Sequence, residues 1–494
     1  MFGGLTRTSS RIALAAALGM TFWGYAMTIQ AKAADFGGGD CCADLEERVA
    51  ELEATTVRKG NKKVSVTVSG WVIKSMNWWS DGKKSSFAVG DKDYDLGSRF
   101  AITGSATIAP GWSAGYNMTV TTGGESWGVL GNQNNEFASV NGALYGNTYA
   151  SINTLYSYVY IKSDKWGALN WGHLSPASDN PAVLADISGS VIESNAVWFE
   201  GGGFFLRPNG QRTLSALSWN SFALCSSQIA PGADCFGTAE PAVRYDSPTW
   251  GGFRFETSYG TQNVLHSLGA FAGPTRDEHF WDIAAFYNND WGNFKISLAY
   301  AYTWMQQNVL SGNEENYHQV GGTLMHVPSG LGIYATGNFE NTGGVNLATG
   351  GNMQDTTQWG VKPFIKRSWN PLGATVLYGE YYQMNGGYSS ISGTNLCGAG
   401  FVPGSNIGNF CVGNGNSGNI AVNSVQVTGS EANRWGLGVV QEIDAAAMHV
   451  FARWQHQDMS ADFVGLNGAN NNTSNVHQGF DNFDFFQVGG IIFF

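Results

Sequence analysis

The clearest pattern in the chain is an alternation of hydrophobic and polar residues that begins at Lys63 and recurs almost to the C-terminus. In Lys63–Val72 every second residue from Val64 onward is a valine or a glycine, and most of the residues between them are serine or threonine. Successive side chains of a strand point to opposite faces of the sheet, so this period of about 2 predicts strands with one apolar and one polar face.

A different period precedes the first strand, in Asp44–Thr56. Its hydrophobic positions are four and three residues apart in turn, which is the spacing of a heptad seam: Leu45, Val49, Leu52 and Thr56. Arg48 and Glu53 stand where interchain salt bridges form in coiled coils. We therefore expect a short oligomerising helix that leads into the first strand. The alternative is an isolated amphipathic helix before an ordinary sheet.

Short turns and long connections alternate along the remaining chain. Seven tight turns are expected at 110–112, 165–167, 249–251, 290–292, 327–330, 369–371 and 444–446. They imply sixteen antiparallel strands if both ends of the sheet lie on the same side. We expect these strands to begin near residues 64, 97, 113, 153, 168, 239, 252, 279, 293, 317, 331, 356, 373, 432, 447 and 482. Segments 123–152, 175–238 and 385–431 are long and rich in Gly, Ser and Asn.

Tight turns on one side and long loops on the other are typical of an outer-membrane β-barrel, whose strands must close because lipid cannot pair with backbone groups. Sixteen strands leave a water-filled interior. Tryptophan recurs at five of the turns, which predicts an aromatic girdle at one membrane interface, on the periplasmic side. Its members are Trp112, Trp166, Trp250, Trp291 and Trp369.

Composition agrees with this interpretation and argues against several other classes. Charged residues make up 13% of the chain, and 67 glycines suit many turns. The net charge is −12, and no basic stripe indicates binding to nucleic acid. The sequence contains no phosphate-binding glycine loop, HExxH motif, zinc-type CxxC pair or nucleophile elbow. We therefore expect no enzyme activity, no cofactor and no metal site; an outer-membrane hydrolase is the enzyme alternative, but no Ser/His/Asp spacing supports it. Four of the eight histidines lie in expected strands and are interpreted as lumen-facing polar residues: His279, His318, His326 and His449.

Residues 1–33 have the pattern of a secretory signal peptide. Arg7 and Arg11 precede the apolar stretch Ile12–Ile29, and Ala31-Lys32-Ala33 is a small-x-small cleavage site. An uncleaved membrane anchor is the alternative. We expect residues 34–62 to form a periplasmic linker with the short helix, and residues 63–494 to form the barrel.

Export permits disulfides, and the six cysteines occur in three close pairs. Cys225 with Cys235 and Cys397 with Cys411 each lie within one loop segment, so we expect two local loop disulfides. For Cys41 and Cys42 an interchain disulfide and a free or vicinal pair are both open.

The two ends of the mature chain carry a family resemblance. The last residues, FDNFDFFQVGGIIFF, alternate and end on the aromatic Phe494; together with YDSPTWGGFRFETSYG (Tyr245–Gly260) they resemble the general bacterial porins. The opening CCADLEERVAELEATTVRKGNKKVSVTVSGWV resembles the alphaproteobacterial porin family in particular. The resemblance implies a sixteen-stranded barrel, a homotrimer and a third long loop folded into the lumen. We also expect the strand ending at Phe494 to close against the first strand near Val64–Val72.

The narrowest ring of a pore sets its selectivity, and loop 175–238 is the candidate for that ring. Four acids precede its first base, Arg207, and we assign them to the constriction: Asp179, Asp186, Glu193 and Glu200. Basic residues on polar strand faces are assigned to the pore wall: Arg99, Arg244, Arg254, Lys362, Arg434 and Arg453, with Lys366 close to them. A solvated surface loop with ordinary acids is the alternative.

These expectations describe an outer-membrane channel of a Gram-negative cell for passive diffusion of small hydrophilic solutes and ions, surrounded by outer-membrane lipid. Weak cation selectivity follows if the loop acids enter the lumen. A solute-selective channel and a structural surface barrel are the alternatives, and the second would normally need a large passenger domain that this chain lacks.

Overall fold

The structure is a computed structural model. It describes residues 63–92, 97–123, 133, 151–195, 201–202, 204–210, 219, 239–261, 279–307, 313–341, 351–352, 354–386, 424–466 and 474–494. The predicted signal peptide, the heptad stretch, Glu200 and all six cysteines lie outside these residues, so their predictions stay predictions.

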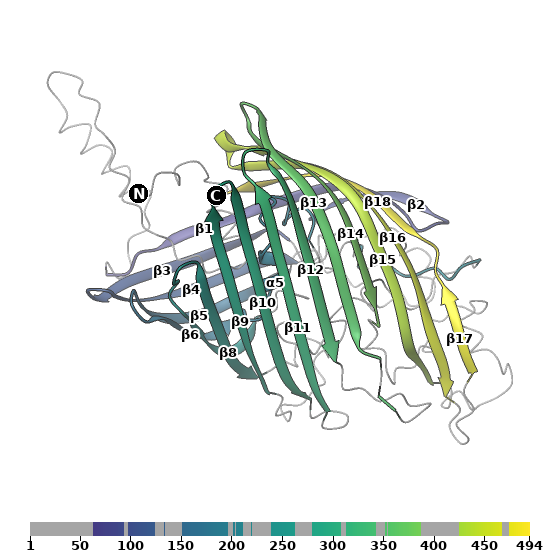
Figure 1. Ribbon diagram of the computed structural model, residues 1–494, viewed down its shortest axis with the longest axis horizontal. Coiled ribbons are helices and arrows are strands. Elements are labelled where there is room, and N and C mark those ends of the chain that lie inside the picture. Colours follow the sequence, from purple (N-terminus) through teal and green to yellow (C-terminus); the bar gives the residue numbers. More distant parts are fainter. Residues whose placement is uncertain are drawn as a thin grey trace.

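Nearly all of the described chain is β-structure (Figure 1). The strands are β1 (Thr67–Ser80), β2 (Ser85–Gly90), β3 (Arg99–Ala109), β4 (Trp112–Gly123), β5 (Ser151–Ser163), β6 (Gly167–Leu174), β7 (Glu240–Asp246), β8 (Phe253–Thr261), β9 (His279–Trp291), β10 (Phe294–Gln307), β11 (Asn313–His326), β12 (Leu331–Asn341), β13 (Thr356–Asn370), β14 (Gly373–Asn385), β15 (Ser424–Ile443), β16 (Met448–Leu466), β17 (Ser474–Gly479) and β18 (Phe483–Phe493). The helical elements are α5 (Pro181–Leu184) and the 3₁₀ turn η6 (Asp444–Ala446). No helix among the described residues is long and apolar enough to span a membrane.

All strand pairs are antiparallel, and the eighteen strand segments occupy sixteen positions in one closed sheet. Both β2 and β3 pair with β1, so together they make one position that is interrupted between Gly90 and Arg99. Likewise β17 and β18 both pair with β16 and share the last position. The predicted sixteen-stranded antiparallel barrel is therefore confirmed, but the prediction missed that the second and the last strands are each split.

The tight turns are also where the sequence predicts them. Four strands begin at their expected residues, 279, 331, 356 and 373, and the largest difference is β15, expected near 432 and observed from Ser424. The loop-side half of β15 is rich in Ser, Gly and Asn, and this composition hid its strand pattern. The short connections lie at one end of the barrel, as Figure 1 shows for the turns that join β11 to β12 and β13 to β14.

The barrel closes between its first and last strands. Trp71–Ser80 of β1 pairs with Asp484–Phe493 of β18, and Gly70 and Phe494 exchange two backbone hydrogen bonds of 2.9 and 3.0 Å. Closure was expected near Val64–Val72, but the ladder is shifted toward the long loops, because Phe494, the last residue of the sequence, lies opposite Gly70. The last residue therefore takes part in closure.

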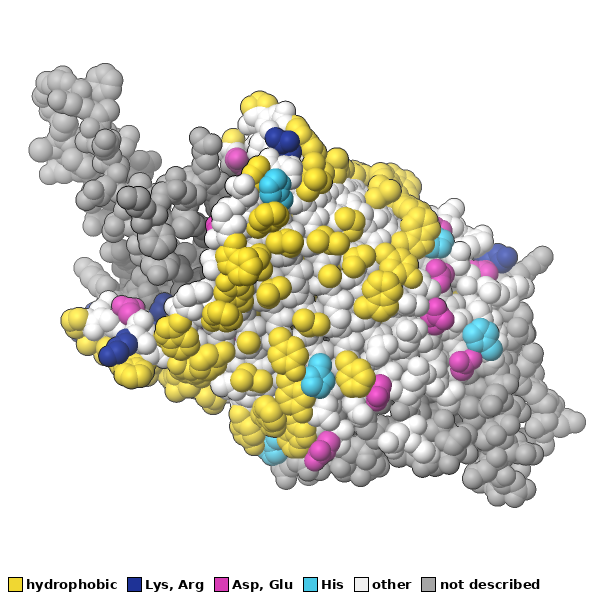
Figure 2. Space-filling model, viewed as in Figure 1, with side chains coloured by type: hydrophobic (Ala, Val, Ile, Leu, Met, Phe, Trp, Pro, Cys, Tyr) yellow, Lys and Arg dark blue, Asp and Glu magenta, His cyan; other side chains and the backbone are white. Residues whose placement is uncertain are grey.

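The two faces of the wall differ in polarity. On β10 the outward side chains Phe294, Leu298 and Tyr300 are 42–48% exposed, whereas inward Ser297 and Thr303 are buried. Figure 2 shows the result as an apolar outer surface broken by few charges. Large apolar side chains on the outside and polar ones inside are the reverse of a water-soluble protein and fit a wall surrounded by lipid.

Candidate functional site: a segment folded into the barrel

The chain that follows β6 turns into the barrel and crosses the inner face of the wall from β7 to β16. We call residues 175–195 the docked segment. The first residue of the segment, Ser175, is attached to the wall. Its carbonyl oxygen accepts a hydrogen bond of 2.7 Å from Arg244 Nη1. The same guanidinium contacts Asp246 at 2.7 and 3.1 Å, and Asn170 Nδ2 donates to Asp246 at 2.9 Å. Arg244 is thus an anchor for the segment as well as a wall residue.

The next anchor is Ser178, which bonds to three strands at once. Its backbone N–H and hydroxyl both donate to Asp282 on β9, at 2.8 and 2.7 Å. Thr303 on β10 donates to the Ser178 hydroxyl at 2.7 Å, and Gln319 on β11 donates to the Ser178 carbonyl at 2.9 Å. Because all these groups are buried, their hydrogen bonds fix the position of the backbone here.

Helix α5 then lies directly on the wall. Tyr334 on β12 donates to the carbonyl of Ala182 at 2.8 Å, and Thr323 on β11 donates to that of Ala185 at 2.6 Å. A side chain at Gly321 would place its Cβ only 2.1 Å from the Ala182 oxygen, so this glycine is what allows the close approach.

Asp186 is bound by the wall lysine Lys362. The Asp186 Oδ2 to Lys362 Nζ distance is 2.5 Å, and both side chains are almost fully buried. The same ammonium donates to Ser190 Oγ at 3.1 Å and to the Ser194 carbonyl at 2.7 Å. These three partners use all three donors of the lysine, so Lys362 ties the middle of the segment to β13.

The end of the segment meets β14, β15 and β16. Glu193 lies 3.0 Å from His449 Nδ1 on β16, and Ser194 donates to Glu380 on β14. Arg434 on β15 donates to the carbonyl of Asn195. Each of these wall residues is buried. The segment is therefore attached along its whole length by hydrogen bonds and ion pairs.

A further stretch of the same long loop, 201–210, closes the space beside β17, β18 and β1. Arg207 pairs with Asp81 at 2.7 Å, and Asp481 N–H donates to the Arg207 carbonyl at 2.7 Å. Phe204 stacks within 4.8 Å of both Trp79 and Phe483. This side of the interior is a packed aromatic cluster rather than open space.

The expected wall residues all lie on the inward face of their strands. Arg99 stacks 4.5 Å over Trp71, and Arg254 pairs with Glu256 and lies 4.1 Å over Phe286. Arg453 donates to Gln487 at 2.7 Å. Among the loop acids that the structure describes, Asp179 is the one that interacts electrostatically with Arg99 and Arg244. Asp186 and Glu193 lie against Lys362 and His449 instead, so the acids and the expected arginines do not form two opposed rows.

Asp179 differs from the other two described acids because it forms no ion pair with a base among the described residues. It accepts hydrogen bonds from Ser175 Oγ at 2.5 Å and from Asn180 Nδ2 at 2.6 Å. Burial raises the pKa of the Asp179 carboxyl to about 7, although the Ser175 hydrogen bond and the nearby Arg244 act in the opposite direction. The charge on this residue therefore changes near neutral pH.

Sequence reasoning missed several residues that hold the segment: Ser178, Asp282, Gly321 and Glu380. A signal for two of them was present. Asp282 and Glu380 are acids at inward positions of strands whose outward positions are apolar, and a buried acid needs partners. Alternation places Gly321 on the polar face with Gln319 and Thr323, but nothing in the sequence alone shows that α5 lies against it.

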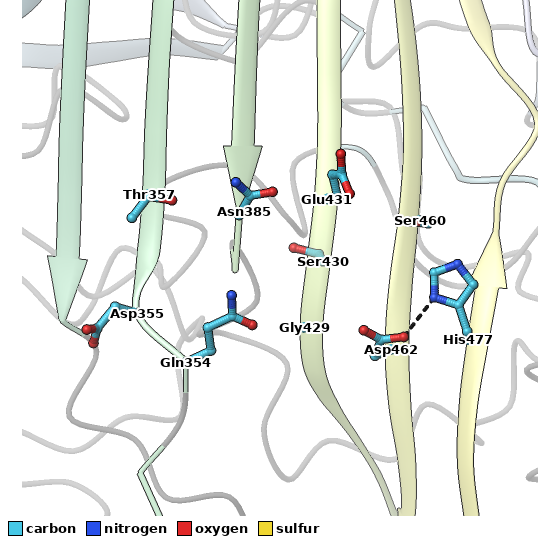
Figure 3. Close-up of a pocket in the computed structure, with 10 residues that line it drawn as sticks. All are labelled: Gln354, Asp355, Thr357, Asn385, Gly429, Ser430, Glu431, Ser460, Asp462 and His477. Atoms are coloured by element: carbon cyan, nitrogen blue, oxygen red, sulfur yellow. Dashed lines mark hydrogen bonds and ion pairs between the residues drawn. The ribbon is translucent and has the colours of Figure 1, made fainter.

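The outer surface carries the predicted aromatic girdle residues and one polar cavity. Trp112, Trp166, Trp250, Trp291 and Trp369 all stand at the tight turns and are 44–64% exposed. At the opposite end, a cavity of ≈ 330 Å³ lies over β13 to β17 (Figure 3). Thr357, Asn385 and Glu431 form one row of its lining, and His477 bonds to Asp462 at 2.8 Å. These side chains point away from the lumen, so they are not part of a channel.

A closed barrel with an apolar outer surface and a segment bound inside its lumen defines a channel of the outer-membrane type. A family model described as Gram-negative porin matches residues 43–483, so the chain belongs to the Gram-negative porin family. This confirms the resemblance to the bacterial porins, without testing the alphaproteobacterial branch, and the chain is an outer-membrane porin channel.

Solved structures of other proteins share the fold. An anion-selective porin from Comamonas acidovorans has a TM-score of 0.50 and 13% identity, covering 87% of this chain and 100% of that chain. OprB of Pseudomonas putida, at high pH, has a TM-score of 0.50 and 11% identity, covering 91% and 97%. Identities this low support the fold alone. The search of curated proteins found no match.

Proposed function

We propose that the docked segment narrows a water-filled lumen through which small hydrophilic solutes and ions diffuse passively. The observation that carries the proposal is the series of contacts from Ser175 to Asn195, which attaches the segment inside the wall from β7 to β16. Because each anchor is buried and hydrogen-bonded, the segment is a fixed part of the pore. We also propose that the chain is a member of the alphaproteobacterial branch, on the sequence of its opening.

The charge inside the barrel supports weak cation selectivity. Among the buried side chains of the described residues, carboxylates outnumber lysines and arginines by about two to one. Many of these charges are paired, as Asp186 is with Lys362, and paired charges largely cancel for a passing ion. Only charges within roughly 8 Å of the path act at physiological salt, so the acids of the narrowest part dominate.

Reversal potentials in planar bilayers test the selectivity. Replacing Asp179, Asp186, Glu193 and Glu200 by their amides should move the reversal potential toward anions. Glu431→Gln, on the outward face of β15, removes one negative charge away from the lumen and serves as the control. If the four amides leave both conductance and reversal potential unchanged, the constriction lies elsewhere in the chain.

Liposome swelling with sugars of graded size separates the candidate functions. A diffusion channel should admit sugars by size alone, and rates should fall smoothly as the sugar grows. A solute-selective channel would favour one sugar out of size order. Absence of swelling with every sugar, despite folded protein, would favour a structural barrel.

We propose further that the channel is a homotrimer and that the heptad stretch contributes on the periplasmic side. Two heptads are too short to be stable alone, so contacts between barrels must contribute most of the free energy of assembly. Leu45→Asp with Leu52→Asp should lower the temperature at which trimers dissociate, and an unchanged temperature would remove the helix from the assembly.

A further inference from the structure

The barrel wall is interrupted at the long-loop end of its seam, which is the line along which β1 meets β18. The ladder between these two strands ends at Ser80 and Asp484, because β1 turns back there toward β2. β17 lies beyond that point, at the long-loop end of the barrel, and its ladder is with β16 (Figure 1). The residues that join β17 to β18 therefore pass the end of β1 without pairing with it.

A short stretch of the long loop pairs with these joining residues. We call residues 204–210 the seam segment. The Asn209 N–H donates to the Gly479 carbonyl at 3.0 Å, and the Asp481 N–H donates to the Arg207 carbonyl at 2.7 Å. Each of the two stretches thus donates one hydrogen bond to the other, as the strands of an antiparallel pair do.

The residues at the centre of this contact are Pro208 and Phe480, which form an antiparallel bridge. The Phe480 N–H donates to the Met459 carbonyl on β16 at 3.0 Å. Phe480 therefore has β16 on one side and the seam segment on the other, as a residue inside a sheet has two neighbouring strands. Proline in a sheet is confined to edge positions, because it has no N–H to donate, and Pro208 fits such a position.

The side chain of Arg207 ties the seam segment to two other parts of the chain. Arg207 Nη2 lies 2.7 Å from Asp81 Oδ2 in the turn between β1 and β2, and both side chains are almost fully buried. Gln133 Nε2 donates to the same carboxylate oxygen at 2.8 Å, and Gln133 Oε1 accepts from the Phe205 N–H at 2.8 Å. Removing one partner of a buried ion pair leaves the other charge uncompensated, so this contact fixes the segment strongly.

The inner side of the seam segment is apolar. The ring of Phe204 lies 4.8 Å from those of Trp79 and Phe483, and the Trp219 N–H donates to the Phe204 carbonyl at 3.0 Å. All four side chains are buried. The seam segment thus fills the lumen on a side that the docked segment does not reach.

We propose that the seam segment completes the wall beside the break between β17 and β18, and that Arg207 is the positioning residue that holds it there. The segment then forms a second fixed boundary of the pore, on the seam side. Releasing Arg207 lets the segment leave the wall, so the open cross-section of the pore increases. The inference rests on the diffusion channel proposed above, since only an open pore has a cross-section to enlarge.

Two substitutions of opposite charge test the role of Arg207. Arg207→Met and Asp81→Asn break the same ion pair, but one removes a positive charge and the other a negative one. We expect both to raise single-channel conductance and to admit larger sugars in liposome swelling. A purely electrostatic role would shift the reversal potential in opposite directions and leave the size limit for sugars unchanged, which would overturn the proposal.

Two matched variants control for the loss of a base. Arg207→Lys keeps a positive charge beside Asp81 and should retain the wild-type size limit. Arg367→Met removes an exposed base from the outward face of β13 and should change neither conductance nor the size limit. An increase in the size limit with Arg367→Met equal to that with Arg207→Met would refute a role specific to the seam segment.

An engineered disulfide tests whether position, and not charge, is what Arg207 supplies. Bridge partners in an antiparallel pair lie close enough for a disulfide, so Pro208→Cys with Phe480→Cys should link when oxidised with copper phenanthroline. Mass mapping without reduction should find the linked peptides. In the Arg207→Met background the link should restore the wild-type size limit, or restore folding if Arg207→Met alone does not fold, and reduction should reverse the rescue. A link that never forms, or one that rescues nothing, would contradict the proposal.

Comparison with the docked segment separates this inference from the proposed function. If the four amide variants of the long loop alter conductance or reversal potential while Arg207→Met and Asp81→Asn leave the size limit unchanged, the diffusion channel stands and the seam segment is not its boundary. If neither set alters any of these quantities, both proposals are wrong. A larger size limit in both seam variants, reversed by the disulfide, supports both.

Discussion

The wall formed by β9 to β12 differs from the wall formed by β16, β18, β1 and β2 in its strands, its outer surface and its inner surface. The first has unbroken strands, an outer surface of residues such as Ile283 and Leu298, and an inner surface that binds the docked segment. The second contains both strand breaks, a lysine on its outer surface and an aromatic cluster inside, with Phe204 against Trp79. The first wall is therefore regular. The second wall joins strands from the two ends of the described chain.

The difference shows which part of a barrel wall can form from the alternation of apolar and polar residues alone. Neighbours along the chain pair through tight turns, so β9 to β12 need only the correct period and register. At the seam, β1 must find β18 across the whole chain, and side chains supplement the backbone ladder. Gln487 on β18, for example, donates to Ser75 at 3.1 Å and to Asn77 at 2.6 Å on β1. The following predictions test this contrast.

The largest effect is expected from removing the closing strand. Deleting residues 482–494 removes every β18 pair with β1 and with β16, and each open backbone group in lipid costs several kcal/mol. We expect no heat-modifiable barrel on gels after refolding into vesicles. Phe494→Ala is the control, because the Gly70–Phe494 hydrogen bonds use only backbone atoms. Normal amounts of folded deletion variant would show that the seam is not needed for closure.

A charge placed on the regular wall should have the next largest effect. Leu298 is 48% exposed in the middle of the outward row of β10. Leu298→Lys should lower the free energy of unfolding in lipid vesicles by about 2–4 kcal/mol, since no protein group covers this surface. Leu298→Met keeps the position apolar and should change it by less than about 1.5 kcal/mol. Equal values for both variants would mean that this wall is covered by protein.

The inner side of the regular wall depends on a single close approach at Gly321. Gly321→Ala places a Cβ 2.1 Å from the Ala182 oxygen, whereas Gly337→Ala on β12 meets only Val320 Cγ1, at 3.4 Å. Forcing α5 away should cost about 1–3 kcal/mol and loosen the docked segment. We expect single-channel conductance to rise in Gly321→Ala and to stay at the wild-type value in Gly337→Ala. Unchanged conductance in both would separate α5 from the narrow part of the pore.

The regular wall was the easier part to predict from sequence. Its strands have clear period-2 patterns between sharp turns, so the expected starts of β9 and β12, at 279 and 331, coincide with the observed ones. The split strands were not predictable in the same way. β2 is only six residues long, and what makes it part of the wall is its pairing with β1, which sequence periodicity does not report.

The candidate site was predictable in location but not in its contacts. The length and acidity of segment 175–238 indicated a constriction, and its first part does lie inside the barrel. The partners of Asp186 and Glu193 depend on which inward residues of β13 and β16 reach the segment. Which residues reach the segment is set by the register and the tilt of the strands. Identifying bases on polar strand faces, such as Arg99 and Arg254, gives neither the register nor the tilt.

The smallest effect we predict is a pH dependence carried by Asp179. Its pKa is raised from 3.8 to about 7 in the folded chain because the carboxyl is buried, although the Ser175 hydrogen bond and the nearby Arg244 act in the opposite direction. A raised pKa means that the docked conformation favours the protonated acid. Its contribution to docking is therefore fully present below pH ~4 and is lost as the pH rises through about 7. Over the same range the lumen gains up to one negative charge, so cation preference should increase between about pH 6 and pH 8.

Reversal potentials measured across this range should show a midpoint near 7 in the wild type. Asp179→Asn should remove that change, while Glu431→Gln, which alters the outward face of β15, should retain it. A pH dependence that survives in Asp179→Asn would assign the titration to another group and leave Asp179 without a part in selectivity.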